Sequence, residues 1–184
     1  TDWNSGTMEL SDALANKRKD ILSLWIERTL DSYTSSGFFK RSKDPFANPV
    51  GVSIATGLTA LFDLLLANAD QSAFLEPLDT VVRIRAVQEF TPSQALAPFL
   101  ELKWVVRQIF SGSKETRPIL PMLDDLDCRI DRMALTAFDI YTACREQLSQ
   151  HRVSELKSGR AILTDAACPS ALMRQERRET GTNN

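Results

Sequence analysis

The chain has 184 residues, which is enough for one domain, or for one domain and a tail. Hydrophobic residues make up 43% and charged residues 25% of it, so it can build a hydrophobic core. The balance of 22 basic against 24 acidic side chains gives a net charge of −2, which argues against nucleic acid as the main partner.

The first predicted helix runs from about Ser11 to Tyr33, where apolar residues recur at steps of three and four. A connector follows, up to Asn48. Its three phenylalanines, Phe38, Phe39 and Phe46, are expected to anchor it on a helical bundle.

A second helix is predicted from Asn48 to about Asn68, with Asn48 as its cap and Pro49 in its first turn. Gly51 and Gly57 lie inside it, and each costs about 1 kcal/mol relative to alanine. Small residues at these positions would make sense if another helix crosses closely.

Two further helices are predicted on either side of a compact break. The third spans about Ala73 to Glu89, and the fourth begins at Thr91 and Pro92 and continues to Phe110. Pro98 lies inside the fourth helix, removes the hydrogen bond back to Gln94 and should bend the first turns.

The last predicted helix is long, from Leu120 or Pro121 to about Glu155, and carries two apolar rows. The first row is heptad-like, and we expect it to form a dimer interface made by Leu123, Leu126, Ile130, Met133, Ala137 and Ile140. The second row contains Leu135, Phe138 and Tyr141. One row could face the core while the other meets a second chain, or both could be core.

These elements predict an all-α fold, a single bundle of about five main helices with a long C-terminal helix. The predicted helical domain covers residues 1–157, and residues 158–184 form a polar tail. The N-terminus carries no secretory signal, and no apolar stretch is long enough to insert into a membrane, so we expect a cytoplasmic protein.

No residue constellation in the sequence predicts catalysis or a cofactor. His151 is the one histidine and has no partner in any catalytic motif, and the three cysteines have no metal-binding spacing. The acidic run from Asp124 to Asp127 is explained by the positive end of the helix that it begins. We therefore expect a protein that is not an enzyme and holds no metal or cofactor.

The most unusual segment is the stretch from Arg83 to Ala95, which joins the third and fourth helices. Two arginines and two glutamines, Arg83, Arg85, Gln88 and Gln94, form a dense polar corner that could bind an anion or a partner loop. The alternative is an ordinary ion pair, because Arg85 and Glu89 are one helical turn apart.

This segment resembles the signature of the N-terminal domain of RsbRD-type RsbT co-antagonist proteins. The likeness extends to the segments 24–33 (LWIERTLDSY) and 46–51 (FANPVG), and to Leu102-Lys103, and it covers residues 10–109. It implies a helical sensory domain related to the non-haem globin-like input domains of RsbR proteins, which dimerise. In those proteins a STAS output domain follows, but the roughly thirty residues after the last helix here are too few for one.

The resemblance therefore implies a regulatory input domain of bacterial stress signalling that acts through a homodimer and protein contacts. Its partners would be stressosome-type components. Such domains are also similar to proteins encoded beside sulfite-reduction complexes, so a redox-complex adaptor is one alternative. A haem or small-ligand sensor is the other, although a proximal histidine is missing from the middle helices.

Overall fold

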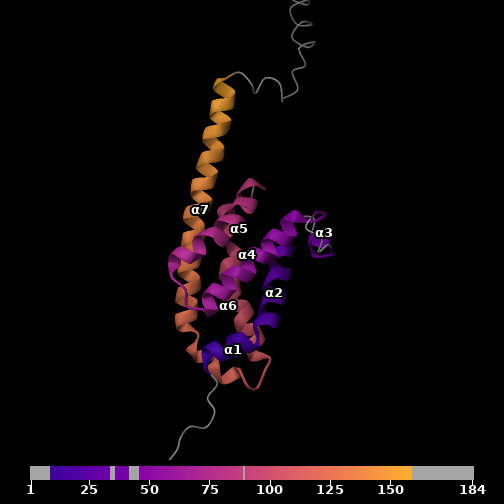
Figure 1. The fold of residues 1–184 in the computed structure, drawn as a ribbon, viewed down its shortest axis with the longest axis vertical. Helices are drawn as coiled ribbons and strands as arrows, with labels where there is room; N and C mark the ends of the chain where they lie inside the picture. Colours follow the sequence, from indigo (N-terminus) through magenta and orange to yellow (C-terminus); the bar gives the residue numbers. More distant parts are fainter. Residues whose placement is uncertain (1–8, 34–35, 42–45, 89, 159–184) are drawn as a thin grey trace, which may run out of the picture. The chain divides into compact units, whose positions relative to one another are not determined.

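A computed structural model (Figure 1) describes residues 9–33, 36–41, 46–88 and 90–158, and all regular structure in these ranges is helical. The all-α prediction is therefore confirmed. In chain order the helices are α1 (Leu10–Asn16), α2 (Arg18–Asp31), α3 (Ser36–Arg41), α4 (Pro49–Leu66), α5 (Leu75–Val87), α6 (Pro92–Ser111) and α7 (Asp124–Lys157). Short 3-10 helices precede α5 and α7, η1 (Gln71–Phe74) and η2 (Arg117–Met122).

The chain divides into two units, Thr1–Ala143 and Cys144–Asn184. In the first unit α4 packs against α2 and α5, and α2 also packs along α6 (Figure 1). Most side chains with no exposed surface in these helices are apolar, among them Ile21, Trp25, Ile54, Leu58, Leu61, Leu78, Val82, Phe99 and Leu102. The core thus draws on the helical faces that the three- and four-residue periodicity predicts.

The first predicted helix is in fact two helices. The backbone leaves helical geometry at Lys17, where φ is −98° and ψ is 7°, and α1 then packs on both α2 and α4. Ala13 and Leu14 are buried in this contact, and Arg18 holds Asp63 of α4 through two hydrogen bonds of 2.7 and 2.8 Å. The apolar pattern continues through the break, which explains why it was read as one helix.

Helices α4 and α5 cross closely at Gly57. A Cβ atom at this position would lie 2.5 Å from Cγ2 of Val81, so only glycine fits without movement of the Val81 side chain or of α5. The expected reason for a small residue is therefore confirmed. At Gly51 the added atom would instead meet the Asn48 side chain, which caps α4 by accepting a 2.8 Å hydrogen bond from the Gly51 N–H.

Among the described helices, only α4 is long and apolar enough to cross a membrane by length and composition. Its position accounts for this composition, since its buried residues include Ile54, Leu58 and Leu61. Core helices of ordinary bundles show the same hydropathy.

The connector after α2 differs from the prediction. Phe39 packs edge-on against Tyr33 at 5.4 Å between ring centroids, as expected of an anchor. Phe46, in contrast, is 97% exposed and Phe38 is 54% exposed, so neither is buried in the bundle. Asn48 makes a polar contact with this connector, because its side-chain amide donates to the Phe39 carbonyl at 2.7 Å.

The second unit contains the end of α7, from Cys144 to Lys157, and its side chains from His151 onward are exposed. Of the predicted tail, 158–184, all but Ser158 lies outside the described residues. The last helix was predicted from Leu120 or Pro121 to about Glu155, whereas α7 runs from Asp124 to Lys157. The predicted start is too early because the 3-10 helix η2 occupies residues 117–122.

Candidate functional site

Arg85 lies on the inner face of α5 and has no exposed surface. Its Nη2 donates to the Ser32 hydroxyl at 3.0 Å and to the Gln94 carbonyl at 2.8 Å. Its guanidinium carbon lies 4.3 Å from the ring centroid of Phe90 and 5.0 Å from that of Tyr33. A buried cation is thus held between two aromatic rings and two oxygen acceptors.

The start of α6 provides one of these acceptors. Thr91 and Gln94 form a capping box, in which each side chain accepts a hydrogen bond from the backbone N–H of the other residue. Four residues after Gln94, Pro98 has no N–H to offer in the helical pattern. The Gln94 carbonyl therefore takes its hydrogen bond from Arg85.

The carbonyl of Pro98 is engaged as well. The indole Nε1 of Trp25, a fully buried side chain of α2, donates to it at 2.7 Å. Helix α2 is thus joined to α6 at Pro98, and α5 is joined to α6 one turn earlier at Gln94. The proline inside α6 lies at the meeting point of three helices.

Arg85 is incompletely paired. A guanidinium has five N–H donors, and Nη2 uses two of them. Among the described residues, Arg85 Nε and Nη1 and the Tyr33 hydroxyl are buried polar atoms without a hydrogen-bond partner. No carboxylate of the described residues forms a salt bridge with Arg85, and Glu89, the alternative partner one turn away, lies outside the described residues.

Burial has opposite effects on the two groups. It lowers the pKa of Arg85 from its ordinary value, and the neighbouring Tyr33 and Glu101 partly oppose this effect. It raises the pKa of the Tyr33 phenol, and the positive charge of Arg85 partly offsets that rise. Both shifts have burial as their largest cause, so the corner carries a charge that solvent does not reach.

A cavity of about 280 Å³ lies beside this cluster, and Arg85 lines it. The other lining residues are Arg28, Ser32, Phe90, Gln94, Ala97, Pro98 and Glu101. Glu101 is held by Arg28 through hydrogen bonds of 3.3 and 3.4 Å. Two arginines and one glutamate leave this wall with one excess positive charge.

The predicted corner residues separate in the structure. Arg85 and Gln94 come together, although Gln94 contributes its backbone carbonyl and not its amide to Arg85. Arg83 is exposed and pairs with Asp79 on the same helix at 2.6 Å. Gln88 is exposed at the end of α5 and does not line the cavity.

The sequence analysis missed Ser32, Tyr33 and Phe90 as neighbours of Arg85. Ser32 and Tyr33 lie more than fifty positions from Arg85 in the chain, and no spacing rule connects them. A recognisable signal was present in Pro98, which frees a carbonyl that some buried donor must satisfy.

The predicted dimer interface has to be corrected. Leu123, Leu126, Ile130, Met133 and Ala137 are each at most 3% exposed, and Ile140 is half-buried. These side chains fill the core of the chain itself, so they offer almost no surface to a second chain. The second row divides: Tyr141 is buried and donates to the Phe90 carbonyl at 2.5 Å, whereas Leu135 and Phe138 are 66% and 45% exposed.

Leu135 and Phe138 have apolar neighbours on α6. The ion pairs Lys103–Asp131 and Arg107–Asp127 align α6 and α7 in opposite directions. One turn beyond the first pair, Leu100 on α6 is at about the same level along the helices as Leu135 on α7. We call Leu100, Trp104, Leu135 and Phe138 the α6–α7 patch.

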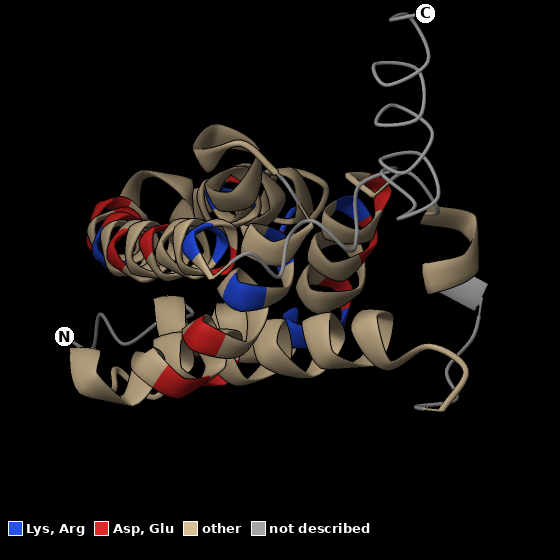
Figure 2. Ribbon diagram, turned by 90° about the horizontal axis from the view of Figure 1, so that it is seen from above, with Lys and Arg blue, Asp and Glu red and all other residues tan. Residues whose placement is uncertain are grey.

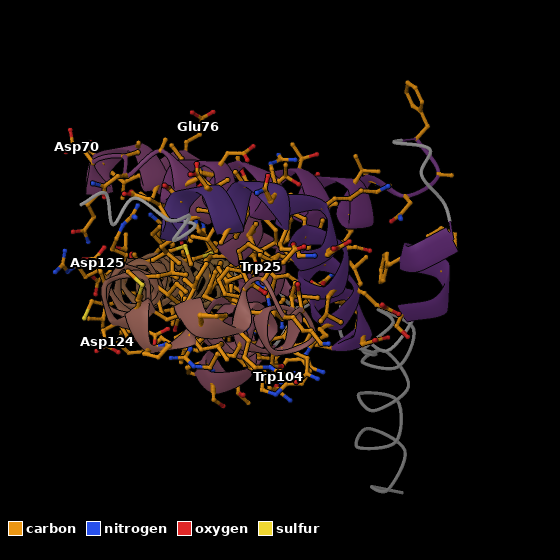
Figure 3. All side chains as sticks on the ribbon, turned by 90° about the horizontal axis from the view of Figure 1, so that it is seen from below. Trp25, Asp70, Glu76, Trp104, Asp124 and Asp125 are labelled. Atoms are coloured by element: carbon orange, nitrogen blue, oxygen red, sulfur yellow. The ribbon has the colours of Figure 1, made fainter. Side chains whose placement is uncertain are left out.

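Two tryptophans, Trp104 of α6 and Trp25 of α2, illustrate the difference between patch and core. Trp104 lies toward the rim of the helices and Trp25 lies among them (Figure 3). Trp104 is 46% exposed and carries the Arg28 guanidinium over its ring at 4.4 Å. Basic and acidic residues are both scattered along the helices (Figure 2).

The described residues contain no group of three or more His, Cys, Asp or Glu side chains that could hold a metal ion. Cys128 is exposed and Cys144 is buried, both as free thiols. The candidate site therefore consists of a buried arginine beside a small cavity.

The comparisons with known proteins gave one match. The family model described as the RsbT co-antagonist protein RsbRD N-terminal domain matches residues 19–156. This family is a stressosome-associated sensory domain with a regulatory role in signalling. No curated protein and no solved structure matches the chain.

Proposed function

The chain belongs to the RsbRD N-terminal domain family, and from this premise we propose that it is a non-catalytic input domain that acts through protein contacts in cytoplasmic stress signalling. The single observation that supports this is the α6–α7 patch. Four large apolar side chains, each at least 45% exposed, lie on α6 and α7, two helices that the Lys103–Asp131 and Arg107–Asp127 ion pairs join. Patches of this kind on a folded domain mark contact sites.

The composition of the patch suits a protein partner. Aromatic side chains are enriched at the centres of interfaces, and Trp104 and Phe138 provide two of them. The ion pairs Lys103–Asp131 and Arg28–Glu101 border the patch and provide a polar rim. A rim with both charge signs can pair with itself in a twofold arrangement, so we propose a homodimer through this patch.

Native mass spectrometry of the purified full chain tests the dimer. We expect a species at twice 20.6 kDa that is lost in the variants Leu135→Glu and Leu100→Glu. Leu75→Glu is the matched control, since Leu75 is 49% exposed on α5 and outside the patch. A monomeric wild-type chain, or a dimer that survives both patch substitutions, would overturn the proposed interface.

A sensor of a small ligand is the second candidate function. The incompletely paired Arg85 and the cavity beside it favour it. An enzyme remains the least supported alternative, because the described residues bring no nucleophile and base together in this cavity.

A further inference from the structure

We propose that the cavity beside Arg85 binds a short-chain monocarboxylate, such as propionate, with the carboxylate at the Arg85 guanidinium. This inference is independent of the α6–α7 patch and of the oligomeric state. It names the chemistry of a ligand that a sensory domain with this corner can recognise.

The buried donors provide the first argument. Arg85 has no exposed surface, and its Nε and Nη1 have no hydrogen-bond partner among the described residues. Leaving such donors unpaired costs on the order of 1–3 kcal/mol for each group, so native structures rarely do so. The nearby Tyr33 hydroxyl is unpaired too. A carboxylate in the cavity that Arg85 lines can accept a hydrogen bond from one of these unpaired guanidinium N–H groups; Nε–H and Nη1–H lie on different edges, so one carboxylate engages one edge.

The electrostatics of the site limit the charge of the ligand. The aromatic rings of Tyr33 and Phe90 face the guanidinium but supply no negative charge. Arg28 and Arg85 against Glu101 leave one excess positive charge on the lining. A monoanion balances it, whereas a second negative charge on the ligand would be repelled by the Glu101 carboxylate, which lines the same cavity.

The size and lining of the cavity limit the carbon part. A volume of about 280 Å³ is at the small end for ligand pockets, which favours a molecule of a few non-hydrogen atoms. Phe90, Ala97 and Pro98 contribute apolar surface to the cavity, and Ser32 and Arg85 contribute polar groups. A short alkyl chain ending in a carboxylate matches this division.

The test uses the ¹⁵N-labelled full chain and follows the arginine Nε–Hε signals by NMR during titration with sodium propionate. Ionic strength is held constant with sodium chloride, and the Arg85 signal is assigned by its absence in Arg85→Lys. We expect a saturable shift of this signal, with half-saturation on the order of 1 mM, as suits so small a ligand. The exposed Arg83 signal, two residues away, should stay in place.

A variant that fills the cavity separates binding from folding. Ala97 lines the cavity and is exposed, so Ala97→Leu should fold and abolish the shift. Ala15→Leu, at an exposed position on α1, is the matched control and should keep it. No saturable shift of Arg85, or the same shift in Ala97→Leu, would show that Arg85 is structural only. A tighter response to inorganic phosphate than to propionate would overturn the carboxylate assignment.

Discussion

Arg85 of α5 donates a hydrogen bond to the Gln94 carbonyl, the acceptor that Pro98 leaves without its usual helical donor. The buried arginine and the helix-interrupting proline are thus two parts of one arrangement. The arginine donates a hydrogen bond to a carbonyl of α6, and the proline leaves that carbonyl free to accept it, so α5 is attached to α6 there. Each residue alone would be unfavourable at its position.

This relationship predicts an energetic coupling between Arg85 and Pro98. In Pro98→Ala the backbone N–H of residue 98 can donate to Gln94, so Arg85 becomes less important. Arg85→Met should therefore lower the free energy of unfolding less in the Pro98→Ala background than in the wild type. The difference between the two losses should be about 0.5–1.5 kcal/mol. Urea unfolding of the four proteins measures it. Arg83→Met, the control, should cost the same in both backgrounds, and equal costs for Arg85→Met would refute the coupling.

The close crossing at Gly57 predicts a steric penalty. Gly57→Ala places a Cβ atom 2.5 Å from Val81, and the resulting displacement of α5 should lower the free energy of unfolding by about 1–3 kcal/mol. Gly112→Ala is the control, because its nearest neighbour would be 3.5 Å away. Thermal unfolding of both variants measures the difference. Equal stability of the two variants would mean that the helices adjust freely.

The buried contact between Trp25 and Pro98 predicts a second stability difference. Trp25→Phe removes the indole donor and part of the core volume, and it should lower the free energy of unfolding by about 1–3 kcal/mol. Trp104→Phe removes a half-exposed indole and should change it by less than about 1 kcal/mol. If chemical denaturation shows Trp104→Phe to be the more destabilising variant, the hydrogen bond from Trp25 to the Pro98 carbonyl contributes little to stability.

The raised pKa of Tyr33 predicts a loss of stability in alkali. A phenol in the unfolded chain loses its proton near pH 10, while burial keeps Tyr33 protonated to higher pH in the folded chain. The unfolded state therefore gains stability first as pH rises. The difference in free energy of unfolding between the wild type and Tyr33→Phe should fall between about pH 9 and pH 11. A constant difference across that range would show that Tyr33 titrates normally.

Much of the fold follows from local sequence signals. Asn48 with Pro49 and Thr91 with Pro92 fix the starts of α4 and α6, because their side chains and missing N–H groups suit a helix end. The break at Lys17 was not predictable in this way. It has no glycine or proline, and it arises where α1 turns to pack on α4.

The site was predictable only in part. The polar segment around Arg85 is visible in the sequence, but burial decides between Arg85 and Arg83, and burial depends on which face of α5 meets α2 and α6. The same limit explains the misplaced interface on α7. A heptad-like row fits a core and a dimer seam equally well, and Ile130 and Ala137 turn inward to the chain's own core.

Helix α1 has a practical consequence for work on isolated domains. The family match begins at residue 19, after α1 and after Arg18, which binds Asp63 on α4. A protein that begins at residue 19 would lack Ala13 and Leu14 of the core, and it would expose the apolar surface of α2 and α4 that α1 covers. Expression of such a fragment should therefore yield aggregates, whereas starting upstream of Leu10 should preserve a soluble product.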